Sequence, residues 1–231
     1  MTTRTGESEP ATPLAVREDI VIADPPSFVS WYLDHVRRGP AYYRRGGAIR
    51  GGAARLEFGD LAWAVLLEGR PSSMAAAGLL AMAPIDIGEV PNDPLHRLDD
   101  DGIEAIVSVV CTLTRVPGIA SAVATKMLHP LRPATIPVLD NAAIYGSYLL
   151  PGFRPGAKPK SRVVKDAATV REALTAIREA TAAPEAEQAW MILEQAHAGF
   201  TRVELFDMAW WTLIYAQVGK AERGWRLKGD G

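Results

Sequence analysis

Apolar residues recur at helical spacing along most of this chain, and runs that alternate between apolar and polar residues are scarce. A spacing of three to four residues places side chains on one face of a helix, whereas a half-buried strand needs strict alternation. Residues 25–38 are typical: they follow Asp24 and begin with two prolines, a favoured helix start. The sequence therefore predicts an all-α fold.

Further helices follow from the same pattern. Two short apolar ones are expected over residues 58–69 and 72–83, the second capped by Ser72 or Ser73. Residues 41–57 hold four glycines and four arginines and predict a loop, with a short hairpin within it as an open alternative. A basic loop rich in proline and glycine is expected over residues 151–165. Further expected helices cover residues 99–116, 166–181, 184–199 and 202–220, and one more follows Asp140 over residues 141–150.

The length of 231 residues allows one large domain or two small lobes that share a core. We expect residues 18–231 to form a single unit of two helical lobes with a cleft between them. Residues 1–17 are polar, lack the apolar stretch of a signal peptide, and predict a disordered tail. Since the sequence has no run of about 18 apolar residues, we expect no membrane-spanning segment and a cytoplasmic location. The oligomeric state stays open.

The amino-acid composition limits the disulfides, metal sites and charged surfaces that this chain can form. Cys111 is the only cysteine, which excludes an internal disulfide and any cluster held by four cysteines of this chain. The four histidines are scattered without metal-ligand spacing, so neither a metal nor another cofactor is expected. The net charge is −2, so a surface for nucleic acid would have to be a local basic patch.

Residues 113–128, LTRVPGIASAVATKML, predict two helices joined by a tight turn at Gly118. Such a turn exposes backbone N–H groups, and the start of the second helix aims them at an anion such as a phosphate. This pattern resembles the hairpin of the helix-hairpin-helix DNA glycosylase superfamily. The resemblance implies that Gly118, Ile119, Ala120 and Ala122 lie against the DNA backbone.

Asp140 follows the hairpin after the link HPLRPATIPVLD, residues 129–140. In the superfamily an aspartate stands after a link of this length and character, and the match needs no gap from Pro117 to Asp140. The resemblance implies that Asp140 is the catalytic carboxylate. The structural alternative is a helix cap, since aspartate is a preferred residue there. The two roles can coexist.

Two positions depart from the superfamily pattern. The second glycine of the turn is Ala120, and the residue that matches the lysine nucleophile of the bifunctional enzymes is Ala122. Lys126 lies one helical turn further on and does not match that position. The resemblance therefore implies a monofunctional enzyme that uses no lysine Schiff base at the usual place. The cysteines of the iron–sulfur subgroup are absent as well.

An enzyme that removes a nucleobase from DNA also needs a pocket for the extruded nucleotide and a basic surface that binds the DNA backbone. Tyr42, Tyr43 and Trp63 are the candidate pocket residues, although a core position is the stronger interpretation of Trp63. Residues 37–55 hold six arginines and no acid, and residues 151–165 hold five basic residues and no acid. The candidate DNA-binding side chains are Lys126, Arg44, Arg45 and Arg132.

Three functions are compatible with these features. The leading hypothesis is a monofunctional DNA glycosylase in which Asp140 helps to hydrolyse an N-glycosidic bond. The second is a helix-hairpin-helix module that binds DNA without cutting it, which the missing lysine, Ala120 and the net acidity favour. The third is an enzyme of the same fold that acts on a nucleoside or another small molecule.

Overall fold

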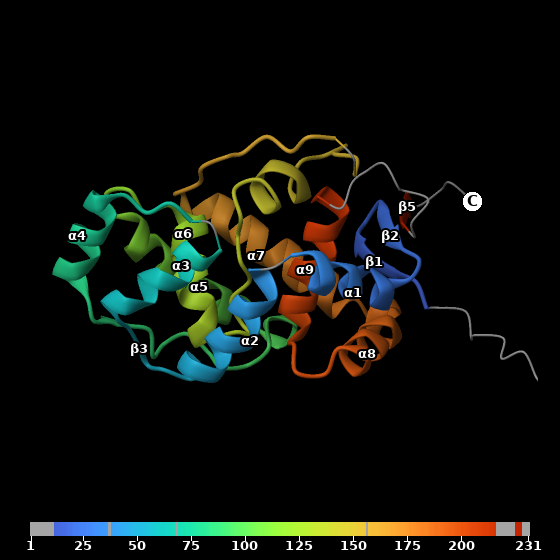
Figure 1. Ribbon diagram of the computed structural model, residues 1–231, viewed down its shortest axis with the longest axis horizontal. Helices are drawn as coiled ribbons and strands as arrows, with labels where there is room; N and C mark the ends of the chain where they lie inside the picture. Colours follow the sequence, from blue (N-terminus) through green and yellow to red (C-terminus); the bar gives the residue numbers. More distant parts are fainter. Residues whose placement is uncertain (1–11, 37, 68, 156, 216–224, 228–231) are drawn as a thin grey trace, which may run out of the picture.

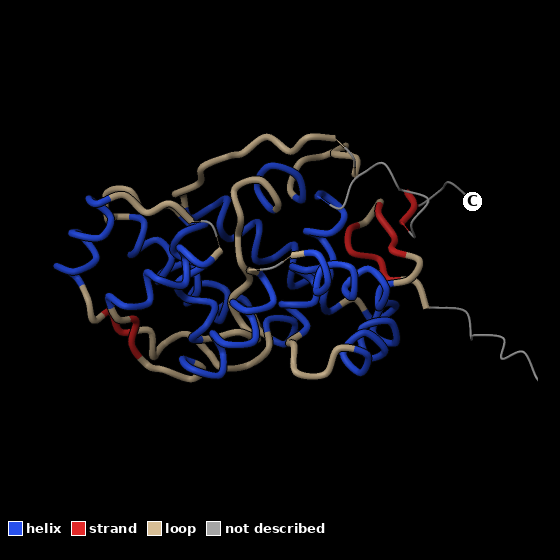
Figure 2. The backbone as a smooth tube through the Cα atoms, in the orientation of Figure 1, coloured by secondary structure: helices blue, strands red, loops and turns tan. Residues whose placement is uncertain are grey.

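The chain folds mainly into helices, as the sequence predicts (Figures 1 and 2). The structure is a computed structural model that describes residues 12–36, 38–67, 69–155, 157–215 and 225–227. Its α-helices are α1 (Pro25–His35), α2 (Gly39–Arg50), α3 (Leu61–Leu66), α4 (Ser73–Met82), α5 (Asp100–Thr114), α6 (Ser121–Leu128), α7 (Ala167–Ala182), α8 (Glu187–Ala196) and α9 (Arg202–Tyr215).

The helices form an elongated body (Figure 1). One end holds α3 and α4, and the other holds α1, α8 and α9, with α7 between them. Helix α1 packs against α9, while α5 packs against both α6 and α7. Large side chains fill the interior continuously from one end to the other. The largest fully buried ones are Trp190, Trp210, Tyr42, Tyr145 and Phe206.

Two of the helices, α1 and α4, start where their capping residues predict. Asp24 accepts a hydrogen bond from the amide of Ser27, 3.2 Å away, at the start of α1. Ser72 accepts one from the amide of Ala75 at the start of α4, so Ser72 and not Ser73 is the cap. Each cap satisfies one of the N–H groups that have no partner within a first helical turn.

The prediction of a loop over residues 41–57 is wrong for residues 41–50, which belong to α2, whereas residues 51–57 form a turn and the short strand Arg55–Leu56. The glycines within α2 do not form a turn; they allow other parts of the chain to pack closely against the helix. A Cβ atom on Gly46 would lie 3.0 Å from Pro130, and one on Gly47 would lie 3.2 Å from Pro133. Tertiary contact with the 129–133 segment thus outweighs the poor helix propensity of glycine.

Strands supplement the helices at two places. β1 (Leu14–Arg17) pairs antiparallel with β2 (Ile20–Ile22), which pairs with β5 (Trp225–Leu227). The prediction of a tail as far as residue 17 is therefore wrong from Leu14 onward, because Leu14 and Val16 are buried in the core. Residues 1–11 of that prediction lie outside the described residues. The second sheet pairs β3 (Arg55–Leu56) with β4 (Ile85–Asp86).

The region around the expected hairpin consists of α5, a turn, α6 and a buried link. Gly118 in the turn has φ +84°, a left-handed conformation that favours glycine. After the single 3₁₀ turn at His129–Leu131, residues 132–140 run without regular structure to Asp140. A short π-helix, η4 (Ile144–Tyr148), follows. The indole of Trp210 on α9 donates to the carbonyl of Ala143 at 2.7 Å and so anchors this region.

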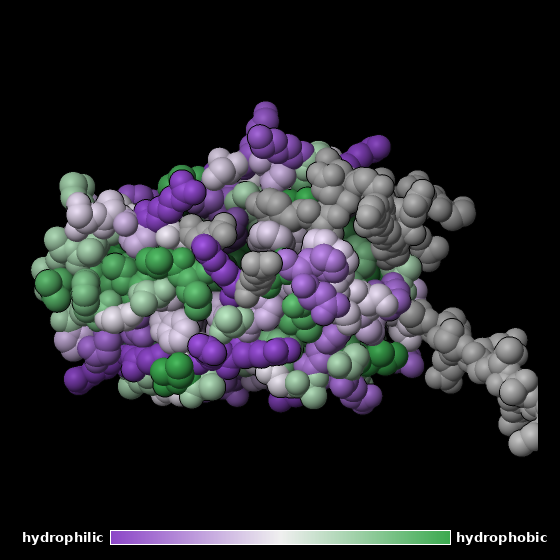
Figure 3. Space-filling view, in the orientation of Figure 1, coloured by the Kyte–Doolittle hydropathy of each residue, from purple (hydrophilic) through white to green (hydrophobic). Residues whose placement is uncertain are grey.

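Apolar side chains gather on the surface of α3 and α4, at one end of the molecule (Figure 3). Val65, Met74 and Leu80 are each more than half exposed there. None of the helices in the described ranges has both the length and the apolar character required to cross a membrane. The exposed apolar residues do not line the large cavity described below.

Gly146 provides a test of the packing around η4. A Cβ atom there would lie 2.1 Å from the carbonyl oxygen of Lys160, a backbone atom that cannot move aside cheaply. We expect Gly146→Ala to lower the free energy of unfolding by about 2 kcal/mol or more, measured by urea denaturation. Gly59→Ala is the control, because nothing lies within 4 Å of the position that its methyl group would take, and it should change stability by less than about 0.5 kcal/mol. Equal effects of the two variants would contradict the packing described here.

Candidate functional site

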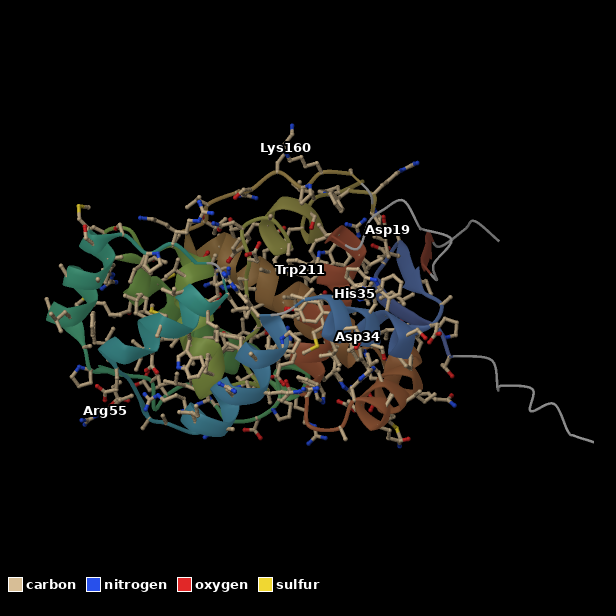
Figure 4. The ribbon with its side chains drawn as sticks, viewed as in Figure 1. Asp19, Asp34, His35, Arg55, Lys160 and Trp211 are labelled. Carbon is tan, nitrogen blue, oxygen red and sulfur yellow. The ribbon has the colours of Figure 1, made fainter. Side chains whose placement is uncertain are left out.

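A cavity of about 650 Å³ lies where α1, α2, α6, the link, η4 and α9 meet. Its size is within the range of small-molecule sites in proteins. Figure 4 labels two residues of its lining, His35 on α1 and Trp211 on α9. The lining residues that matter for chemistry are Trp31, Tyr43, Lys126, Asp140, Asp207 and Trp211.

Asp140 is both a cap and a lining residue of this cavity. Its Oδ1 accepts hydrogen bonds from the amides of Ala142 at 2.8 Å and Ala143 at 3.1 Å. Its Oδ2 accepts one from Nζ of Lys126 at 3.0 Å, and the side chain remains 26% exposed. Burial raises the pKa of Asp140, but the charge and hydrogen bond of Lys126 and the two amides outweigh it, so the net pKa is lowered. The carboxylate is thus ionised at neutral pH.

Lys126 reaches this carboxylate from one turn beyond Ala122. The side chain is buried, and its ammonium also donates to the carbonyl of Leu67 at 3.2 Å. Ala122 is buried and does not line the cavity. Sequence matching placed no lysine next to Asp140. The i to i+4 spacing of Ala122 and Lys126, which places them on one helix face, was the signal that could have identified Lys126.

Asp207 is a second carboxylate of the cavity, and the sequence analysis did not single it out. Its side chain is buried, and its Oδ2 accepts a hydrogen bond from the amide of Val138 at 3.1 Å. Burial raises the pKa of Asp207 to about 7, with help from the negative charges of Glu204 and Asp140. His129 and the Val138 amide oppose that rise. An acid within the apolar run of α9 was the sequence signal for a buried carboxyl group.

The three aromatic residues proposed for a base pocket lie in different places. Tyr43 lines the cavity. Tyr42 lies behind it, fully buried, with its hydroxyl donating to the carbonyl of Lys126 at 2.8 Å. Trp63 lines a separate, more open cavity of about 490 Å³ beside Arg50 and Asp60. Only Tyr43 of the three is therefore placed to contact an occupant of the large cavity.

Other aromatic residues surround the cavity, and the sequence analysis missed them as a group. The rings of Trp31 and His35 stack with centroids 4.4 Å apart and an interplanar angle of 6°. Tyr32 packs edge-on against Trp211 at 5.8 Å. Trp31 and Trp211 are partly exposed and line the cavity, so their rings can contact a planar ligand.

The turn between α5 and α6 has several of its amides already satisfied. The amide of Ile119 donates to the carbonyl of Val116, and that of Ser121 donates to the carbonyl of Val164, each at 3.0 Å. Ile119 and Ala120 are buried, and a Cβ atom on Gly118 would lie 2.5 Å from Oγ of Ser72. An anion at this turn would therefore have to compete with contacts inside the chain.

The candidate DNA-binding arginines fall into two groups. Arg44 and Arg45 on α2 are exposed, and Arg44 lies over the ring of Phe200 at 5.3 Å. Arg132 is buried, and its guanidinium donates to the carbonyls of Val90, Ala53 and Leu131. A guanidinium buried in this way braces the backbone and is not placed to contact a phosphate.

Among the residues that the structure describes, no three side chains of the types that bind metals are gathered closely enough to hold an ion. Comparison with protein-family models, with curated proteins and with solved structures finds no match to this chain. The interpretation of the site therefore depends on its geometry and electrostatics.

The pair of Lys126 and Asp140 can be tested directly. We expect Lys126→Met to raise the pKa of Asp140 by about one unit or more, because the nearest positive charge is removed while the two amides remain. A carbon-detected NMR titration of the aspartate carboxyls would measure this change. Lys160→Met is the control, because Lys160 is exposed on the far loop and points away from the body (Figure 4). An unchanged pKa of Asp140 in Lys126→Met would show that the pair does not form.

Proposed function

We propose that this protein hydrolyses the N-glycosidic bond of a nucleobase in DNA by a monofunctional mechanism. In this proposal, α5, the turn at Gly118 and α6 form a helix-hairpin-helix element, and the large cavity holds the extruded base. The observation that carries the proposal is the state of Asp140: an ionised carboxylate, held by two amides and an ammonium, that lines an aromatic cavity.

The chemistry needs a fixed negative charge. As the base leaves, positive charge develops on the sugar, and a carboxylate beside it stabilises the oxocarbenium-like transition state. The same carboxylate can orient the attacking water. Asp140 meets both needs, because its hydrogen bonds fix its position and its lowered pKa keeps it charged. Catalysis by preorganised charge requires no rearrangement at the moment of reaction.

The cavity suits an extruded base. Enzymes that act on a base remove it from the stack and hold it between aromatic or apolar side chains. Trp31, Tyr43 and Trp211 provide such surfaces around Asp140. The volume of about 650 Å³ leaves room for a base with its sugar.

Two separate groups of exposed basic residues support the choice of DNA as the substrate. Arg44 and Arg45 are exposed, and so are the five basic residues of the loop over 151–165. That loop runs along one long edge of the molecule (Figure 1). Cationic side chains that neutralise phosphates contribute affinity by releasing counterions.

A second candidate function is hydrolysis of a free nucleoside in the same cavity. The observation that favours it is the turn before α6, where Val164 accepts from the amide of Ser121 and Ser72 covers Gly118. The first contact occupies the Ser121 amide, and the second places a side chain next to Gly118, so less of this turn is open to a phosphate. A nucleoside enzyme would need the cavity and Asp140 but not that turn.

Asp140→Asn tests the catalytic role. Asparagine keeps an oxygen for the amides of Ala142 and Ala143, so the helix cap and the fold should persist. Without the negative charge, we expect base release to fall by at least about 100-fold. The assay is release of bases from duplex oligonucleotides that each carry one damaged, deaminated or mismatched base. Asp166→Asn is the matched control, since Asp166 also caps a helix but does not line the cavity.

The outcomes separate the candidate functions. Release from nucleosides but not from oligonucleotides would favour the nucleoside enzyme. DNA binding without release of a base from any substrate would support the hypothesis of a DNA-binding module that does not cut. Trapping of a covalent complex by borohydride would contradict the monofunctional mechanism, and Lys126 would then be the amine to replace.

The two exposed arginines of α2, Arg44 and Arg45, give a separate prediction about DNA binding. We expect replacement of both Arg44 and Arg45 by alanine to weaken DNA binding and to reduce the slope of log Kd against log salt concentration by about 1 to 2. Fluorescence anisotropy at several salt concentrations measures both quantities. Arg171→Ala is the control, because Arg171 is partly exposed but is paired with Glu104. An unchanged slope in the double variant would place the DNA elsewhere.

A further inference from the structure

Two carboxyl groups with different surroundings, those of Asp140 and Asp207, line the same cavity. Asp140 is held by an ammonium and two amides, whereas Asp207 is buried and accepts a hydrogen bond from the backbone. That bond comes from the amide of Val138, two residues before Asp140 in the link. The same short segment therefore positions both groups. When the environments of two carboxyl groups differ in this way, one can act as an acid while the other stays ionised.

The surroundings of Asp207 favour its neutral form. Its burial and the negative charges of Glu204 and Asp140 raise its pKa to about 7, against the opposing effects of His129 and the Val138 amide. The cations that share its cavity, Arg38 and Lys126, do not reverse this rise in the pKa. The other titratable groups that face it or share its cavity are Tyr32, Tyr42, Tyr43 and His35.

We infer that the carboxyl group of Asp207 is the acid that protonates the departing base, while the carboxylate of Asp140 faces the sugar. This inference rests on the proposed function and specifies its substrate class. A neutral base would leave as an anion unless it received a proton, so an acid accelerates its departure. A base that already carries a positive charge leaves as a neutral molecule and needs no acid. The site therefore suits neutral bases that have a hydrogen-bond acceptor facing Asp207.

Atoms and charge balance in this step. The bond between C1′ and the base nitrogen breaks, and its electron pair goes to the base. The proton of Asp207 passes to the acceptor atom of the base, which leaves as a neutral molecule. A water oxygen bonds to C1′ as its proton goes to Asp140. Exchange with solvent then returns a proton to Asp207 and restores Asp140 to its ionised form.

If Asp207 only holds the link in place through the Val138 amide, its replacement should have a different effect on activity. The amide of Val138 needs one acceptor oxygen, and the side-chain oxygen of an asparagine would provide it equally well. If Asp207 only supports the link, Asp207→Asn should therefore keep activity on every substrate. If it donates a proton, the loss should depend on the charge of the base and on pH.

The experiment compares two substrates in the Asp207→Asn variant. The probes are duplex oligonucleotides that contain hypoxanthine, a neutral base, or 7-methylguanine, a cationic one, together with the corresponding nucleosides. We expect single-turnover release of hypoxanthine to fall by about 100-fold, and release of 7-methylguanine to fall by less than about tenfold. Asp60→Asn is the control, because Asp60 is a buried carboxylate paired with Arg50 outside this cavity, and it should keep the ratio of the wild type.

The pH dependence provides a readout that a bracing role would not affect. The acid must be protonated, so release of hypoxanthine by the wild type should decline as the pH rises through about 7. The Asp207→Asn variant should lack this decline, since its amide does not titrate. An equal loss on both substrates, or a decline near pH 7 that persists in the variant, would overturn the inference.

The failure of the proposed function would look different. If the wild type releases neither base from DNA nor from nucleosides, both the proposed function and the role of Asp207 are wrong. If the wild type releases hypoxanthine and Asp207→Asn does so equally fast, only the role of Asp207 is wrong. If the wild type releases 7-methylguanine alone, hydrolysis stands and the assignment of a neutral substrate is overturned.

Discussion

The buried link over residues 129–140, which follows α6 and is hydrogen-bonded to side chains of α6 and α9, is the feature on which the site depends. Irregular backbone inside a protein must find partners for its polar groups, and here side chains of the two helices supply them. The amide of Leu139 donates to Oγ1 of Thr125 at 3.0 Å, and that of Val138 donates to Asp207 at 3.1 Å. Nδ1 of His129 lies 2.6 Å from the carbonyl oxygen of Ile136. These bonds hold the segment that ends at Asp140, so they also fix the carboxylate in the cavity wall.

Buried polar groups also connect α2, the start of the link and α9. Nε2 of His129 lies 3.4 Å from Oε1 of Glu204, and Tyr42 stacks on the imidazole with centroids 5.5 Å apart. Burial lowers the pKa of His129, but the hydrogen bond and the negative charge of Glu204 outweigh it, so the net pKa is raised. Helices α2 and α9 therefore meet around this histidine. Polar networks of this kind favour one arrangement of their members, because each unsatisfied group in the interior is costly.

The predictions from sequence succeeded where local chemistry decides structure. A serine cap for α4 could be predicted because a short hydroxyl side chain satisfies an N–H group of its own helix, although only the structure shows that it is Ser72 and not Ser73. The glycines of α2 misled, since their role depends on Pro130 and Pro133, which lie more than 80 residues further along. Asp207 went unnoticed for a similar reason. Its neighbour in space, Val138, is 69 residues away in sequence, and no local pattern joins them.

The sequence by itself determined a mostly helical chain, the starts of those helices that have a capping side chain such as Asp24 or Ser72, and an aspartate able to cap the turn after the link. The tertiary structure decided what that aspartate faces. Lys126 meets Asp140 because the link folds back along α6, and Asp207 joins the cavity because α9 packs beneath the link. The difference has a physical cause. Helix caps depend on groups three residues apart, whereas the charge state of a carboxyl group depends on burial and on charges brought together by the whole fold.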